Sequence, residues 1–265
     1  MMRTDYQSLA VTIEGSVCHV RLNRPDTRNA IDHRMHDELI DLFGSISGGG
    51  DIRALLLSAE GKVFCAGGDF DLILADRVDP SQRERMRRDG EALFHGLTQC
   101  PLPLVVALHG EAVGLGATLV LGADAVVASR NARLSDPHVV IGLAAGDGGC
   151  ALWPQAVGFL RAKRYLLTGD RLNAEQAHAM GLVTDLVETP EEVLAAALQI
   201  AQRIAALPPL AVQATKKALN AGFRAQTEEA FRLGLEAEME TFFSDDVGEA
   251  IAAFREKRPG QFQGR

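Results

Sequence analysis

Two glycine-rich segments, FCAGGD at residues 64–69 and HGEAVGLGAT at 109–118, could together hold a reacting oxygen. Each follows an apolar run, at 54–58 and at 104–108, that predicts a buried strand. Glycine lacks a Cβ and tolerates positive φ, so backbone amides in such turns can point at a ligand instead of at a neighbouring strand. Two of these turns side by side would direct two N–H donors at one oxygen. We therefore expect an oxyanion hole, whose stabilisation of developing negative charge is often the largest single catalytic contribution.

The elements that must position these turns alternate between strands and helices. Two apolar segments at 8–13 and 17–22 flank Gly15 and predict a β-hairpin. Further helices and strands are predicted from apolar residues at helical spacing and from short apolar runs. The expected helices cover 32–43, 80–98 and 115–122, and the expected strands cover 53–58, 104–108 and 125–129. This order predicts an α/β fold with its sheet buried between helices.

Beyond residue 160 the sequence predicts helices. Capping-box patterns begin two of them at Asn173 and Thr189, and the second continues through an Ala-rich stretch. Two prolines at 208–209 then interrupt the helical pattern and mark the best domain boundary. We expect a core over 1–207 and a helical region over 208–265, which buries little alone and must pack on another surface. The three helices predicted in that region cover 210–221, 227–243 and 245–257.

The composition excludes several classes of function. The chain has 265 residues, 47% of them hydrophobic, and can bury a sizeable core. Its net charge of −8 argues against a general affinity for nucleic acid. The arginines within 83–88 alternate with acidic residues, which favours a solvated helix face over a polyanion site. No apolar run of about 18 residues predicts a membrane span.

The N-terminal segment and the cysteines predict a cytoplasmic protein without a metal site. Residues 1–15 lack the apolar core of a signal peptide and the composition of a transit peptide. Four cysteines lie scattered without metal-ligand spacing, which is typical of a reducing compartment. Cys65, inside the first glycine-rich segment, is interpreted as a small filler residue.

Six blocks of sequence form an ordered series along nearly the whole chain. They are LNRP at 22–25 with NAI at 29–31, FCAGGDF at 64–70, ALHGEAVGLGATLVLGAD at 107–124, DPHVVIGLAAGDGG at 136–149, TGDRLNAEQAHAMGLV at 168–183 and AIAAFREKRPGQF at 250–262. This series resembles the crotonase (enoyl-CoA hydratase/isomerase) superfamily. The resemblance implies a crotonase-type spiral of ββα turns, followed by a C-terminal helical region that forms homotrimers or dimers of trimers. It also implies an acyl-CoA thioester substrate and no tightly bound cofactor, coenzyme A being part of the substrate.

The resemblance assigns the two donors of the oxyanion hole to the backbone amides of Gly68 and Leu115. Many members of the superfamily have glycine where this chain has Leu115. Because the donor is the amide, the leucine side chain needs only to point away. Polarisation of a thioester carbonyl by these donors would acidify the α-carbon and stabilise the resulting enolate.

The chain departs from the superfamily pattern at the two positions that usually carry glutamates. Typical hydratases place one glutamate three residues after the second hole residue and another just after the proline of the following strand. Here these positions hold Thr118 and His138. Two carboxylates acting on one water are required by the usual hydration mechanism, so the sequence argues against that mechanism.

A carboxylate occurs nearby at Asp147, within AAGDGG at 144–149. Dienoyl-CoA isomerases have an acid/base aspartate at or within one residue of this position. Dihydroxynaphthoyl-CoA synthases and chlorobenzoyl-CoA dehalogenase have an aspartate in a similar setting, in the latter as a nucleophile. Asp147 is therefore the candidate acid/base group, with an N-cap of the helix beginning near Gly148 as the alternative; the two roles are compatible.

Two further side chains have two interpretations each. His138 has a pKa suited to proton transfer, although a histidine after Asp-Pro can also serve packing or hydrogen bonding. Thr118 could orient a water or be a small helix residue. Glu111 is a candidate for the acyl pocket. We also expect Leu72, Ile73 and Trp153 to line that pocket.

The resemblance also suggests residues for binding coenzyme A. Arg28 and Lys62 are placed for its phosphates. Ala66, Asp69 and Phe70 would flank the adenine. Phe254 and Lys257 match positions that reach the coenzyme A of an adjacent subunit. Each cation, taken alone, is compatible with a solvated surface charge.

The expected function is proton transfer on an enoyl- or dienoyl-CoA, by isomerisation or by an atypical hydration, as in fatty acid metabolism. Asp147 would be the main acid/base group, with His138 as its auxiliary. One alternative is carbon–carbon chemistry on a β-keto or malonyl-type thioester. Another is an acyl-CoA-binding protein that retains the hole without catalysis. The sequence does not specify the acyl group.

Overall fold

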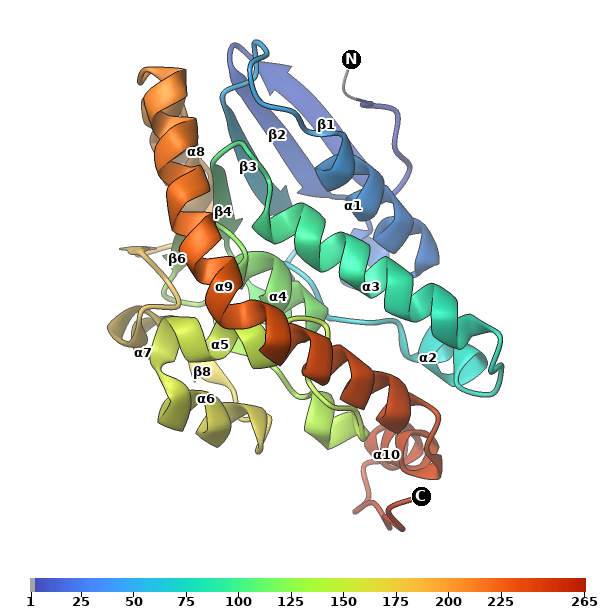
Figure 1. The fold of residues 1–265 in the computed structure, drawn as a ribbon. Helices are drawn as coiled ribbons and strands as arrows, with labels where there is room; N and C mark the ends of the chain where they lie inside the picture. The colour runs from blue at the N-terminus through green and yellow to red at the C-terminus, as the bar shows by residue number, and fades with distance from the viewer. Residues whose placement is uncertain (1–2) are drawn as a thin grey trace.

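The computed structural model describes residues 3–265, whose larger sheet has six strands (Figure 1). In spatial order these are β1 (Leu9–Glu14), β2 (Val17–Leu22), β3 (Ala54–Ala59), β4 (Leu104–Leu108), β6 (Ala125–Ser129) and β9 (Asp185–Val187). β1 is antiparallel to β2, and every other neighbouring pair is parallel. The predicted hairpin and the three other predicted strands are confirmed. β9, three residues long, was not predicted.

A second sheet turns the chain into a spiral. It contains β5 (Glu111–Val113), β7 (Arg133–Ser135) and β8 (Leu172–Asn173), with β7 in the middle. β4 and β6 of the large sheet each lead into a strand of this small sheet, and then into a helix. The α/β spiral of strand, strand and helix implied by the resemblance is therefore confirmed. Strands of two or three residues carry too short a pattern to be recognised from sequence.

The helices cover both sides of the large sheet. They are α1 (His33–Ser45), α2 (Phe70–Asp76), α3 (Gln82–Thr98), α4 (Leu115–Leu121), α5 (Gly149–Val157), α6 (Phe159–Leu166), α7 (Ala174–Met180), α8 (Pro190–Ala205), α9 (Pro209–Phe242) and α10 (Asp245–Glu256), with short 3-10 helices η1 (Pro25–Thr27) and η2 (His138–Ile141). The predicted helices near 32–43, 80–98 and 115–122 are confirmed as α1, α3 and α4. The capping signals at Asn173 and Thr189 also begin helices, α7 and α8, as predicted.

The central strands are buried on both faces, which explains their continuous apolar runs. In β3, Leu55 and Leu57 pack into the core on one face, and Ala54 and Leu56 face α8 on the other. Small residues of α8 at helical spacing form that second contact: Val193, Ala197, Ala201 and Ala205. Because β3 and β4 are parallel neighbours, the two glycine-rich turns that follow them lie at the same end of the sheet.

Helix α9 is continuous over Pro209–Phe242, so the prediction of separate helices at 210–221 and 227–243 was wrong. Gly222 weakened the sequence pattern, but a single glycine costs a helix only about 1 kcal/mol, and no proline interrupts the segment. The C-terminal half of α9 crosses the molecule beside α3 (Figure 1). Its Phe231, Leu235 and Met239 pack against Phe94 of α3 and Leu152 of α5. The helical region beyond residue 208 therefore packs on its own chain.

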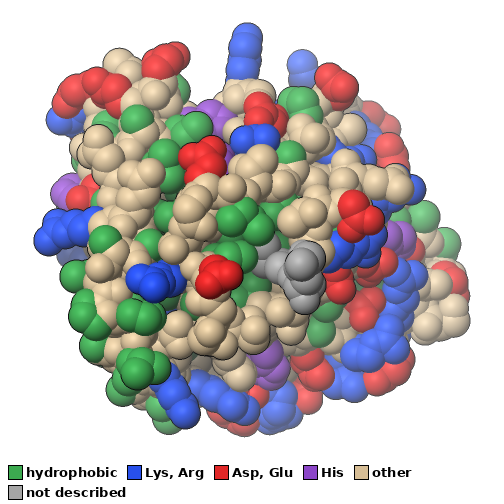
Figure 2. Space-filling model, turned by 90° about the horizontal axis from the view of Figure 1, so that it is seen from above, with side chains coloured by type: hydrophobic (Ala, Val, Ile, Leu, Met, Phe, Trp, Pro, Cys, Tyr) green, Lys and Arg blue, Asp and Glu red, His purple; other side chains and the backbone are tan. Residues whose placement is uncertain are grey.

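Charges on the surface are mixed. Figure 2 shows acidic and basic side chains interspersed around the rim of one face. On α3, Arg85 and Arg88 both pair with Asp89, and Arg87 pairs with Glu84 and Glu91. Between residues 3 and 265 no single helix is long and apolar enough to cross a membrane. Helices α8 and α9 meet the criteria of length and composition only together, and that pair is bent by 108°.

Candidate active site

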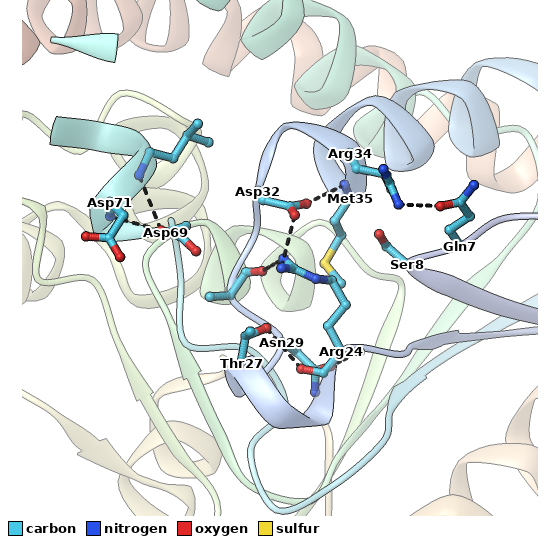
Figure 3. Close-up of polar contacts among 12 residues, drawn as sticks. Gln7, Ser8, Arg24, Thr27, Asn29, Asp32, Arg34, Met35, Asp69 and Asp71 are labelled. Carbon is cyan, nitrogen blue, oxygen red and sulfur yellow. Dashed lines mark hydrogen bonds and ion pairs between the residues drawn. The ribbon is translucent and has the colours of Figure 1, made fainter. Parts of the chain in front are cut away.

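The first glycine-rich turn is held by the preceding 24–31 segment (Figure 3). Asn29 is fully buried with φ of 53°, a conformation that asparagine tolerates better than most residues. Its side-chain oxygen accepts a hydrogen bond from the Arg24 amide at 2.8 Å, and its Nδ2 donates to the carbonyls of Glu60 and Val63 at 2.9 Å. Asn29 therefore fastens this segment to the chain that enters the turn.

The same segment pairs with Gly68 directly. The Ile31 amide donates to the Gly67 carbonyl at 2.8 Å, and the Asp69 amide donates to the Ile31 carbonyl at 3.1 Å. Gly67 has φ of 88°, and a Cβ there would lie 3.0 Å from the Val113 carbonyl oxygen. Only glycine tolerates this φ and leaves room for the Val113 carbonyl. The resulting turn leaves the Gly68 amide without a backbone acceptor among residues 3–265.

The second turn lies against the first. The Cys65 amide donates to the Glu111 carbonyl, and the Val113 amide donates to the Cys65 carbonyl, both at 3.0 Å. Gly114 then adopts φ of 54° and ψ of −122°, and Leu115 begins α4. Cys65 is fully buried beneath these turns, and burial raises the pKa of its thiol to about 12, in agreement with a filler role.

The amides of Gly68 and Leu115 are the predicted donors of the oxyanion hole. Both residues line one cavity of about 210 Å³. Among residues 3–265, neither amide donates to a backbone carbonyl. Both donors are therefore available to a ligand oxygen in the cavity.

An acid/base cluster lines the same cavity. Asp147 Oδ1 accepts a hydrogen bond from the Thr118 hydroxyl at 3.0 Å, and its Oδ2 lies 3.3 Å from His138 Nε2. Thr118 and His138 therefore both contact Asp147, from α4 and from η2. The sequence did not foresee this convergence.

Asp136 completes the cluster and was missed at the sequence level. Its Oδ1 lies 2.5 Å from His138 Nδ1, and its side chain is almost fully buried. His138 thus has a carboxylate at each ring nitrogen. A histidine engaged at both nitrogens has no lone pair free for a substrate, which makes Asp147 the member of the cluster that can face one. The sequence signal for Asp136 was its position two residues before His138, in DPH at 136–138.

Charge determines the protonation of this cluster. Burial alone would lower the pKa of His138, but Asp147 and Asp136 outweigh it and hold the pKa well above the ordinary value of 6.5. Burial would raise the pKa of Asp147, whereas the His138 cation and the hydrogen bonds from His138 and Thr118 lower it below 3.8. The pair is therefore an imidazolium and a carboxylate across the neutral range.

We expect His138 to remain charged at about pH 7.5, one unit above the ordinary histidine pKa. His19, whose pKa burial lowers to about 4, is an internal control that should be neutral. Nitrogen NMR of the labelled protein distinguishes the two forms. A neutral His138 at that pH would contradict the ion pair.

The same pKa shifts make the stability of the folded protein depend on pH. The contribution of His138 to the free energy of unfolding is fully present below pH 6.5 and declines as pH rises through its raised pKa. The Asp147 contribution is present above pH 3.8 and is lost as pH falls through its lowered pKa. The free energy of unfolding of the wild type should therefore exceed that of His138→Gln by the largest amount between pH 3.8 and pH 6.5.

Asp136, His138 and Asp147 also lie close enough together to be considered for a cation. The imidazole ring stands between the two carboxylates, with one nitrogen toward each. When the ring is protonated, both nitrogens are donors and neither can coordinate a metal. The imidazolium itself supplies the positive charge in this cluster.

Glycines allow α9 to approach Asp147. A Cβ on Gly146 would lie 2.3 Å from the Gly234 carbonyl oxygen and 2.6 Å from Glu238 Cβ. A Cβ on Gly149 would lie 2.2 Å from Asp136 Oδ2. The glycines flanking Asp147 are therefore required by packing. Helix α5 begins at Gly149 with Gly148 in the N-cap position, so Asp147 is not the N-cap itself, although its carboxyl group accepts a hydrogen bond from the Gly149 amide.

Glu238 of α9 is the second residue that the sequence did not reveal. It is 9% exposed, lines the cavity, and has no hydrogen-bond partner for Oε2. Burial and the charge of Asp147 raise its pKa to about 8. Its position within a long amphipathic helix carried no sequence signal.

The candidates for coenzyme A occupy different places. Ala66 and Phe70 line the cavity beside Gly68. Asp69 is the N-cap of α2, where it accepts hydrogen bonds from the amides of Asp71 and Leu72 (Figure 3). Arg28 and Lys62 lie exposed outside the cavity, with Arg28 3.5 Å from Glu111.

The two C-terminal candidates end α10. Phe254 is 62% exposed and meets Phe70 of the same chain edge to face, with ring centroids 5.5 Å apart. Lys257 follows in a left-handed conformation as the C-cap of α10. The structure thus brings Phe254 to the rim of the cavity within one chain.

Two expectations about the acyl pocket require correction. Glu111 does not line the cavity, because it pairs with Arg28 and Arg171. Trp153 is buried in the main core, against Tyr165, and also lies outside the cavity wall. Leu72 and Ile73 do line the cavity, as predicted.

The fold and the site together define a class: a spiral α/β protein with two glycine-rich turns and an Asp–His–Asp cluster beside one cavity. The family model for enoyl-CoA hydratase/isomerase matches residues 12–265. The chain belongs to this family of acyl-CoA enzymes, the crotonase superfamily.

Relatives in the family catalyse different reactions. The chain is 33% identical to 1,2-epoxyphenylacetyl-CoA isomerase of Escherichia coli K12, over 96% of this chain and 97% of that protein. It is 32% identical to short-chain-enoyl-CoA hydratase of Clostridium acetobutylicum, over 92% and 93%. A crystal structure of an enoyl-CoA hydratase/isomerase from Mycobacterium paratuberculosis superposes with a TM-score of 0.89, at 34% identity, covering 94% of this chain and 99% of the other.

Proposed function

We propose that this enzyme transfers protons on an enoyl- or dienoyl-CoA thioester, by isomerisation or by an atypical hydration, with Asp147 as the acid/base group. One observation carries the proposal: the Asp147 carboxyl group, whose pKa the His138 cation lowers, lines the same cavity as Gly68 and Leu115, whose amides donate to no backbone carbonyl among residues 3–265. The absence of glutamates at 118 and 138 argues against the usual two-carboxylate activation of water. Similarity to 1,2-epoxyphenylacetyl-CoA isomerase of Escherichia coli K12 also supports an isomerisation.

The proposed reaction begins with the thioester oxygen held by the two amides. The Asp147 carboxylate removes a proton from carbon, and the C–H electron pair passes into the conjugated thioester to give an enolate. The amides of Gly68 and Leu115 stabilise the negative oxygen. His138 stays protonated against Asp136 and Asp147, and so positions the carboxylate without exchanging protons with the substrate.

We further propose that Arg28 and Lys62 bind the phosphates of coenzyme A, with Ala66, Asp69 and Phe70 toward the adenine. Phe254 and Lys257, at the end of α10, would complete this site, and assembly as a homotrimer is proposed from the resemblance. Large exposed apolar side chains on α6 and at the start of α9, including Leu160 and Leu210, support a subunit interface.

The test is a panel of 2-enoyl-, 3-enoyl-, 3,5-dienoyl- and 3-oxoacyl-CoA thioesters incubated in deuterium oxide and followed by mass spectrometry. We expect deuterium at the α- or γ-carbon of the unsaturated thioesters, together with double-bond migration or addition of water. Cleavage of the 3-oxoacyl thioesters without exchange in the unsaturated ones would contradict the proposal and favour carbon–carbon chemistry.

A further inference from the structure

Glu238 has a position that proton removal by Asp147 alone does not explain. It extends from α9 into the cavity that holds Asp147, on the far side of the Gly146 turn. A Cβ on Gly146 would lie 2.7 Å from Glu238 Oε2, so the carboxyl group rests against the backbone next to Asp147. Oε2 is buried, and no protein atom among residues 3–265 bonds it. A carboxyl oxygen buried without a partner is expensive, and a functional reason is expected.

The surroundings of Glu238 favour its neutral form. The nearest charged groups are Asp147, His138 and Asp136, with a combined charge of about −1 in the protonation states argued above. Across the cavity, Arg85 of α3 pairs with Asp89 of α3 and with Asp37 of α1. The other titratable side chains of the wall are His33 and His36 of α1, Asp32 at its N-cap and Asp76 of α2, with His33 paired to Asp76 and Asp32 to Arg24. On α9 the neighbours lining the cavity are apolar. A carboxylate at 238 would lie beside the carboxylate of Asp147 without a cation of its own.

We infer that Glu238 is the second proton-transfer group of the enzyme and donates the proton that completes the isomerisation. This inference rests on the proposed function of Asp147. Asp147 and Glu238 have opposite starting states in one cavity, the first an ionised base and the second an undissociated acid. When their surroundings keep one carboxyl group ionised and the other protonated, the first can remove a proton from the substrate and the second can return one.

The step balances in atoms and charge. Asp147 takes a proton from one carbon of the acyl chain, and the C–H electron pair forms the enolate. The enolate pair then forms a new C–H bond at the other end of the conjugated system with the proton of the Glu238 carboxyl, which leaves Glu238 as a carboxylate. Transfer of the proton from Asp147 to Glu238 through water restores both groups, and the substrate has gained and lost one proton.

The test uses 3-hexenoyl-CoA in deuterium oxide with Glu238→Gln, whose side chain keeps the volume and loses the acidic proton. Two rates are measured: deuterium entry at C2 of recovered substrate and formation of the 2-enoyl product. We expect product formation to fall about 10²–10³-fold, while deuterium entry at C2 stays within about threefold of wild type. Glu238→Asp should recover part of the product rate. Glu240→Gln, exposed on the same helix, is the matched control.

The outcomes separate this inference from the proposal on which it rests. Unchanged product formation in Glu238→Gln, or an equal fall in both rates, would overturn the role of Glu238 as donor. Failure of the wild-type enzyme to introduce deuterium at C2 would instead overturn proton removal. Thermal unfolding of each variant shows whether it is folded, and Glu238→Asp provides the same two-rate comparison if the glutamine variant is not.

Discussion

Asp147→Asn is expected to lower turnover of the preferred thioester about 10³-fold, the largest effect of any single substitution in this enzyme. Asparagine can accept the Thr118 hydroxyl as aspartate does, and its amide can donate to a neutral His138 whose other nitrogen still faces Asp136. The cluster therefore remains satisfied, and the fold should be kept. What is lost is the basic carboxylate in the cavity.

The measurement for Asp147→Asn is turnover and deuterium exchange, compared with binding of a saturated acyl-CoA. Binding should change by no more than about threefold, because the hole and the cavity walls remain. Asp185→Asn, an exposed substitution of the same kind at the start of β9, is the control and should resemble wild type. Turnover of the Asp147 variant close to that of this control would contradict an acid/base role.

Leu115→Pro is expected to lower turnover about 10²–10³-fold, the usual consequence of losing one oxyanion donor. Leu115 is the first residue of α4, where proline is well tolerated because the amide has no partner within the helix. Its amide donates to no backbone carbonyl, so proline breaks no such bond. The preceding Gly114 has ψ of −122° and no Cβ, which avoids the usual clash before proline. The substitution thus removes the donor with little disturbance.

Leu115→Ala is the matched control, because it removes the side chain and keeps the amide. We expect it to retain turnover within about tenfold of wild type. Thermal unfolding should confirm that both variants are folded. If the proline and alanine variants had similar turnover, the Leu115 amide would not be an oxyanion donor.

The proposed hole would also explain why the family supports several reactions. Amides of Gly68 and Leu115 directed at one oxygen would stabilise any thioester enolate, whichever bond then changes. Side chains beside the hole decide the reaction. In this chain those side chains are Asp147, held by Thr118 and His138, together with Glu238 from α9. The same fold with glutamates at 118 and 138 would present a different set of proton-transfer groups.

Local pattern determined a large part of this protein. The apolar runs at 54–58 and 104–108 could be recognised as buried strands because a strand covered on both faces has a continuous apolar sequence. The glycines after them marked turns because positive φ and close backbone approach exclude other residues. The ordered blocks were sufficient for the superfamily and the spiral fold, and they predict the identity of the hole amides. In each case the deciding interactions lie within a few residues.

Only the tertiary structure decided how the acid/base groups are arranged. His138, paired with Asp136, contacts Asp147, and Glu238 reaches the same place from the end of α9, where Gly146 and Gly234 let the helix approach. The continuity of α9 depends on packing against α3 and α5, which its own sequence pattern does not reveal. Protonation depends on burial and on charges brought together by folding, so the charged His138 and the neutral Glu238 could not be derived from residue type. The sequence therefore determined the turns that carry the two predicted hole amides, whereas folding decided which titratable side chains lie beside them.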